Sequence, residues 1–150
     1  MTETNKSLEV LLDKGHHYIT QASETELSYK PKVEKWSKKE ILGHLIDSGI
    51  NNLQRFTELQ FSSRPYIIRQ YDQVGLVKAN DYQNADTSEI LAFWLSLNRR
   101  IASLIKSQTE QTLDYEIQLP NGDLADLRFL ITDYVAHMEH HLNQIMSQES

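Results

Sequence analysis

Apolar residues recur every three or four positions in four long segments of the chain, and this periodicity constrains the fold more than any other feature. Such spacing places apolar side chains on one face of an α-helix, so each segment is predicted to be an amphipathic helix. The predicted helices cover about Lys6–Ala22, Ser37–Phe56, Asp86–Ile105 and Asp123–Ile145. Since each helix must bury its apolar face against the others, the pattern favours an all-α four-helix bundle.

Local signals at the helix ends support these boundaries. Ser37 and Glu40 have the spacing of a capping box, and Asp86 or Thr87 is expected to begin the third helix. The turn at Pro120–Asp123 is expected to end in an N-cap for the fourth helix. The second and third helices are separated by about 25 residues, Leu59–Ala85, and connections of that length are often functional. Residues Leu113–Leu119 are expected to be extended.

Composition narrows the possible functions. With 150 residues, 39% of them hydrophobic, the chain is expected to form one domain spanning residues 1–150. It has no cysteine, which excludes a thiolate metal site and a cysteine nucleophile. A net charge of −6 disfavours nucleic acid as a partner. The polar N-terminus and the lack of a long apolar run predict a cytoplasmic protein that does not enter a membrane.

Three of the six histidines could converge on one point. His137 and His141 are one helical turn apart, with His141 inside the apolar face of its helix and His137 at its margin. His140 points toward solvent on the same helix. On the second helix, His44 lies beside the apolar stripe and is the best candidate for a third ligand. Three neutral imidazoles suit zinc, nickel, copper or iron, and three protein ligands leave a position open for water or substrate.

A structural interpretation of the same histidines stays open at this point. A pair of histidines four residues apart on a helix usually lies on the surface or is satisfied within the core. His16 and His17 lie at the rim of the first helix's apolar stripe or away from it, so they are expected to be solvated. A helical bundle that binds no metal therefore remains an alternative.

Two motifs resemble those of a known family. The segment from Trp36 to Ser48 resembles the second-helix signature of the DinB-like proteins, and the segment from Tyr134 to Ile145 resembles their last-helix signature. The pieces Arg64-Pro65-Tyr66 and Tyr71-Asp72 resemble the connection in the branch with bacillithiol transferases and metal-dependent hydrolases. The resemblance implies an up-up-down-down four-helix bundle with a long crossover between helices 2 and 3. It also implies one metal ion held by His44, His137 and His141.

The resemblance leads to a functional hypothesis: a metal-dependent enzyme that activates a thiol or water, of the thiol S-transferase or hydrolase type. Zinc or nickel is the expected divalent metal, with a small-molecule substrate and an external low-molecular-weight thiol as possible cosubstrate. The alternative is a non-catalytic metal-binding bundle acting as a sensor, carrier or interaction module. Members of the family commonly form homodimers, and we expect one here because Leu91 and Leu95 lie off the main stripe of the third helix.

Several further residues are candidates for the site. Asp47 and Asn51 lie one and two turns along from His44 and are expected to orient a ligand or a bound water. Arg55 is a candidate for anchoring an anionic substrate. Tyr66 and Tyr71, in the long connection, are expected to line the mouth of the site. For each of them, an ordinary surface contact is the competing interpretation.

Overall fold

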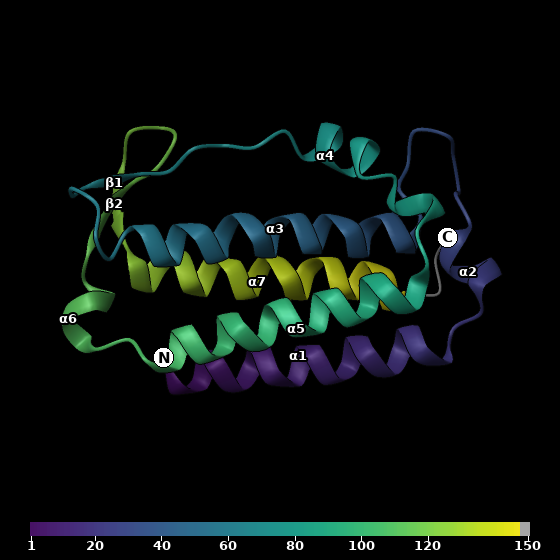
Figure 1. The fold of residues 1–150 in the computed structure, drawn as a ribbon, viewed down its shortest axis with the longest axis horizontal. Helices are drawn as coiled ribbons and strands as arrows, with labels where there is room; N and C mark the ends of the chain where they lie inside the picture. Colours follow the sequence, from purple (N-terminus) through teal and green to yellow (C-terminus); the bar gives the residue numbers. More distant parts are fainter. Residues whose placement is uncertain (148–150) are drawn as a thin grey trace.

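Four long helices form the body of the molecule in the computed structural model, which describes residues 1–147 (Figure 1). They are α1 (Thr2–Gln21), α3 (Lys38–Glu58), α5 (Thr87–Lys106) and α7 (Leu127–Met146). Helix α3 packs against α5 and α7, and α1 packs against the same two helices. The order around the bundle is therefore α1, α5, α3, α7. This arrangement confirms the predicted all-α four-helix bundle with a long crossover between its second and third long helices.

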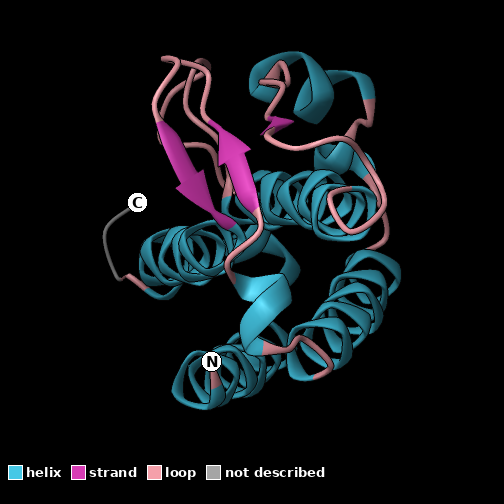
Figure 2. Cartoon of the chain, turned by 90° about the vertical axis from the view of Figure 1, so that its left-hand side faces the viewer, coloured by secondary structure: helices cyan, strands magenta, loops and turns pink. Residues whose placement is uncertain are grey.

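A small sheet at one end of the bundle was not predicted. Figure 2 looks onto this end and shows the strands beside the ends of the long helices. Strand β2 (Glu116–Gln118) pairs in parallel with β1 (Tyr66–Ile67) and antiparallel with β3 (Leu124–Asp126). Only β2 lies within the segment that was expected to be extended. The remaining short elements are four helices: α2 (Glu24–Ser28), α4 (Gln73–Ala79), η1 (Tyr82–Asn84) and α6 (Glu110–Leu113).

The directions of the long helices differ from the expected up-up-down-down order. Ser37, just before α3, donates to Gln83, just before α5, so these two helices start at the same end and run in parallel. At the same end, Lys38 donates to the carbonyl of Ser147 after α7, so α7 runs opposite to α3. Late in α1, Gly15 lies against Leu142 late in α7. The order is thus up-down-down-up (Figure 1).

The physical reason lies in the connections between helices. A connection between consecutive parallel helices must travel the length of the bundle, and only residues 59–86 do so (Figure 1). The shorter connection through α2 stays at one end, so it reverses the chain between α1 and α3. Consecutive parallel helices are consequently possible only for α3 and α5.

The cap residues explain where the helices begin. Ser37 accepts from the Glu40 amide and Glu40 accepts from the Ser37 amide, which confirms the capping box. Asp86 caps α5 as expected. The fourth helix starts later than predicted, because Asn121 and Gly122 form the turn of a β2–β3 hairpin and Asp126 is the N-cap. Gly122 has φ +92°, which glycine adopts without strain.

The crossover is held against α3 by a tyrosine that packs on a glycine. A methyl group on Gly43 would lie 2.1 Å from Cδ2 of Tyr82, so only glycine lets the ring approach the helix this closely. From that position the Tyr82 hydroxyl donates to Asp47 Oδ1 at 2.6 Å. Asn80 donates to the same oxygen at 3.2 Å. The crossover is therefore fixed to α3 within one turn of His44.

The two leucines of α5 that suggested a homodimer are buried within the single chain. Leu91 and Leu95 are each only 9% exposed in the single chain, so they do not offer the apolar surface that motivated the homodimer. The homodimer stays a prediction, and light scattering would test it.

Within residues 1–147, none of the helices combines the length and the apolar character that crossing a membrane requires.

We predict that Gly43→Ala lowers the free energy of unfolding by about 1–3 kcal/mol, because the added methyl group displaces the Tyr82 ring. Alanine's better helix propensity, about 1 kcal/mol, offsets part of this cost. In a Tyr82→Ala background the same substitution should be neutral or stabilising, since the obstructing ring is gone. Urea unfolding of the four proteins measures this coupling, and equal effects of Gly43→Ala in both backgrounds would contradict it.

Candidate metal centre

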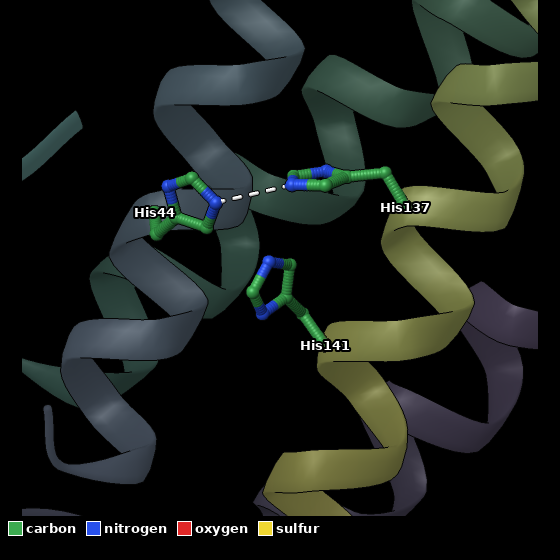
Figure 3. A group of neighbouring side chains, drawn as sticks. All are labelled: His44, His137 and His141. Carbon is green, nitrogen blue, oxygen red and sulfur yellow. Dashed lines mark hydrogen bonds between the residues drawn. The ribbon is translucent and has the colours of Figure 1, made fainter. Parts of the chain in front are cut away.

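Three histidine side chains from two helices converge inside the bundle (Figure 3). His44 comes from α3, and His137 and His141 come from consecutive turns of α7. One ring nitrogen from each lies within 4.8 Å of the others. His44 is 1% exposed, whereas His137 and His141 are partly exposed. The structure thus brings together the three histidines that the sequence singled out.

The ring geometry fits a bound transition metal. The Nε2 atoms of His44 and His137 are 3.2 Å apart. Nitrogens bound at ~2.0–2.1 Å around a tetrahedral ion lie roughly 3.3 Å from each other. His141 Nδ1 is 2.8 Å from Oε1 of Gln144. Because an amide oxygen only accepts, this contact selects the tautomer with hydrogen on Nδ1 and leaves the Nε2 lone pair free to bind a metal.

Burial keeps these imidazoles uncharged. Desolvation, together with the neighbouring histidines, lowers the pKa of His44 to about 4. The pKa of His137 is also about 4, and burial is again the main cause. Desolvation likewise lowers the pKa of His141. At neutral pH the three rings are therefore neutral, and the neutral form is the one that binds metal ions.

Other side chains fix the surroundings of the three histidines. The Trp36 ring lies against the His44 ring, with centroids 5.0 Å apart. Asp47 is buried on α3, and its Oδ1 accepts from Tyr82 and Asn80. Burial raises the pKa of Asp47. Its Oδ2 has no hydrogen-bond partner among the described residues, so Asp47 retains acceptor capacity next to the site.

A cavity of about 440 Å³ opens from His137 along the groove between α3 and α7. One wall is formed by Ser48, Asn52 and Arg55, and the opposite wall by α7 residues that include Asp133 and Tyr134. The crossover contributes Gln70, Tyr71 and Gln73, and the β2–β3 turn contributes Leu119 and Pro120. The size suits a small molecule. A ligand in this cavity would have one end at His137 and extend toward Arg55.

The structure separates the other candidates into two groups. Arg55 and Tyr71 both line the cavity, with the guanidinium 5.5 Å from the Tyr71 ring centroid. Tyr66 does not line this cavity, because its hydroxyl donates to Glu58 at 2.8 Å. Asn51 is likewise outside the lining, since its amide donates to the Asp47 carbonyl within α3. The expected roles of Tyr66 and Asn51 at the site therefore lack structural support.

The remaining histidines lie outside the cluster. His140 is exposed on α7 and is not part of the group of converging ring nitrogens, although its ring lies edge-on to that of His141, with centroids 5.0 Å apart. His16 and His17 are exposed on α1, as expected.

Three residues near the centre were missed in the sequence. Asn52 lies two turns along from His44 on the same face of α3, and Gln144 lies one turn along from His141, so helical spacing alone could have found both. Trp36 precedes α3, and its packing on His44 depends on the path of the chain before the capping box. No periodicity indicates that contact.

Comparisons with known proteins identify a family and several relatives described as metal-dependent hydrolases. The family model described as the DinB superfamily matches residues 8–145. The protein named "Putative metal-dependent hydrolase BH0277", from Halalkalibacterium halodurans, is 25% identical over 140 residues, which cover 93% of this chain and 81% of that protein. "Putative metal-dependent hydrolase YfiT" from Bacillus subtilis is 29% identical over 111 residues, which cover 73% of this chain and 62% of the relative.

Solved structures show the same fold. The structure of Bacillus subtilis YfiT, described as a probable metal-dependent hydrolase with an unusual four-helix bundle topology, superposes with a TM-score of 0.85 at 25% identity. The superposition covers 96% of this chain and 82% of YfiT. A mycothiol-dependent maleylpyruvate isomerase matches with a TM-score of 0.75 at 9% identity, over 98% of this chain and 61% of the isomerase. The second likeness shows a shared fold alone.

We predict that the metal-free protein loses stability as the pH falls from about 7 to about 5. The pKa values of His44 and His137 are about 4 in the folded chain, against 6.5 for an exposed histidine. The unfolded chain therefore takes up protons first, and acid favours unfolding. For buried His44 this contributes roughly 1–2 kcal/mol over that range.

Urea unfolding of chelator-treated protein across this pH range measures the effect. His44→Gln should unfold with a clearly shallower pH dependence, while His17→Gln, at an exposed position, should leave the dependence unchanged. The same slope in His44→Gln as in the parent chain would show that burial of His44 is not the cause.

Proposed function

Because the chain belongs to the DinB superfamily, we propose that it is a metal-dependent enzyme that activates a thiol or a water molecule for attack on a small-molecule substrate. The observation that carries the proposal is the convergence of His44, His137 and His141 beside a cavity of ligand size. Three nitrogen ligands favour zinc or nickel over ions that prefer oxygen. A relative described as a metal-dependent hydrolase supports the same conclusion.

Each residue of the centre has a distinct role in this proposal. His44, His137 and His141 hold the ion as neutral imidazoles, and Gln144 fixes the tautomer and orientation of His141. A divalent ion held there would supply Lewis acidity, which lowers the pKa of a bound thiol or water toward neutrality. Trp36 packs against one side of His44, and in this proposal the substrate occupies the cavity beside His137. Asp47 follows His44 by three residues on α3, and its role in this proposal is to orient a ligand through a bridging water.

The proposal has two candidates for the nucleophile, a thiol and water. The chain has no cysteine, so a thiol must arrive as a separate low-molecular-weight cosubstrate. The fold is shared with a mycothiol-dependent isomerase, which supports a thiol, whereas the names of the relatives support water. Thiol transfer and hydrolysis would both use the same neutral imidazoles and the same cavity. Activity assays therefore distinguish the two reactions.

We predict that the protein, after addition of zinc or nickel, retains about one ion per chain. A His137→Ala, His141→Ala double variant should retain almost none, because one imidazole binds these ions weakly. His140→Gln is the matched control, since it changes an exposed histidine on the same helix and should keep full stoichiometry. Elemental analysis after gel filtration gives the numbers. Full retention in the double variant would refute the ligand assignment.

We also predict that turnover depends on the ion and rises with pH toward neutrality, as the nucleophile loses its proton. Metal-loaded and chelator-stripped proteins are compared in two assays, a small thiol with an aromatic electrophile, and hydrolysis of a nitrophenyl ester. Activity in the first assay identifies a transferase, and activity in the second identifies a hydrolase. Undiminished turnover in His44→Ala would exclude the metal-dependent mechanism, and metal binding without either activity would favour a sensor or carrier.

A further inference from the structure

Arg55 is a partly buried cation without an acidic partner. In the described part of the chain, ion pairs involve four lysines and Arg128, and Arg55 makes none. Burial lowers the pKa of its guanidinium, which nevertheless stays charged at any physiological pH. Cations removed from water normally have a counter-ion, because the loss of hydration is otherwise uncompensated. An arginine of this kind beside a cavity is typical of an anion-binding position.

The guanidinium is held in place by neutral groups. It donates to the carbonyl oxygen of Arg69 in the crossover and, more weakly, to Asn52 Oδ1 at 3.4 Å. The ring of Tyr71 lies beside it. These contacts use two of its five N–H donors. The remaining N–H donors are available to a ligand. Because the contacting groups are neutral, they fix the position of the guanidinium and leave its positive charge uncompensated.

The position of Arg55 along the groove sets the length of the ligand. Arg55 follows His44 by eleven residues on α3, which is about 16 Å along the helix axis. Helical side chains lean toward the N-terminus, and the contact with Asn52 shows that Arg55 does so. Its guanidinium therefore lies on the side of its own Cα that faces the histidines. Ser48, Asn52, Gln70 and Gln73 line the space between and offer neutral hydrogen-bonding groups.

The charges of the cavity limit the anion to a single negative charge. Arg55 is its only lysine or arginine among the described lining residues, and Asp133 contributes a carboxylate. Asp133 precedes His137 by one helical turn on α7 and raises the pKa of that histidine. The negative side chain thus lies one helical turn from His137. One planar guanidinium matches one carboxylate, whereas a phosphate dianion would leave a charge uncompensated.

Resting on the function proposed above, we infer that the substrate is an elongated carboxylic acid, with its reacting group at the histidines and its carboxylate bound by Arg55. Arg55 is then the residue that determines specificity. Neutral molecules of the same shape reach the same centre but bind more weakly, because they leave the guanidinium without a counter-ion. Tyr71 and the Arg69 carbonyl position Arg55 and make the crossover part of the recognition of substrate.

The test uses metal-binding probes of graded length on the full chain loaded with nickel. Acetohydroxamate reports on the metal centre alone. Succinic, adipic and suberic monohydroxamates add a carboxylate at increasing distance, and their terminal amides are the neutral counterparts. Calorimetry gives each dissociation constant. At the length that reaches Arg55, the carboxylate should bind about tenfold more tightly than its amide, as expected for a charge-assisted pair.

Variants of Arg55 test whether this residue causes the preference for the carboxylate over the amide. In Arg55→Gln the carboxylate and the amide should bind within about twofold of each other, while acetohydroxamate binds as in the parent chain. Arg100→Gln is the matched control, because it removes an equal charge from an exposed position on α5 outside the cavity and should keep the preference. Arg55→Lys keeps the charge without the two-pronged donor and should show a reduced preference, which decides the matter if Arg55→Gln does not fold.

Two kinds of failure are distinguishable. If acetohydroxamate does not bind to the loaded protein, the proposed metal-dependent function fails before Arg55 is tested. If acetohydroxamate binds but no carboxylate exceeds its amide at any length, the inference about the substrate is wrong and the metal centre stands. A carboxylate preference that persists undiminished in Arg55→Gln and Arg55→Lys would also overturn the assignment to this residue.

Discussion

The parallel arrangement of α3 and α5 is the constraint on which the rest of the structure depends. Two consecutive helices that start at the same end require a connection as long as the bundle, and residues 59–86 provide it along the outside of α3. That path brings Tyr82 onto Gly43 and Tyr71 onto Arg55. A bundle with only short connections would leave this face of α3 open to water. Here the connection forms one wall of the cavity beside the histidines.

The three histidines are held in fixed positions in an environment that disfavours their charged form. Three imidazoles lie close together in a partly dry site, where protonation of any one is opposed by burial and by its neighbours. Helix packing on both sides, rather than attraction between the rings, holds them there. A bundle that holds three desolvated imidazoles together has exchanged some stability for a preorganised set of ligands, which is a common arrangement at functional sites.

The sequence was sufficient for features that depend on helical spacing. The four long helices, the capping box at Ser37 and the convergence of His137 with His141 all follow from residues three or four positions apart. Features that depend on pairing between distant segments could not be predicted. The parallel register of Tyr66 with Ile117 has no local signal. Tyr66 itself was expected near the mouth of the site, but the sheet directs its hydroxyl to Glu58.

The parallel orientation of α1 and α7 also affects how the protein can be rearranged. Thr2 and Met146 lie at opposite ends of the bundle (Figure 1). Joining them for a circular permutation would require a linker along a helix of 20 residues, about 30 Å, or roughly nine extended residues at least. Copies fused head to tail need no such detour, because each chain leaves the bundle at the end opposite to where it entered. Tandem fusions would therefore extend as a row of bundles, each keeping its groove accessible from the side.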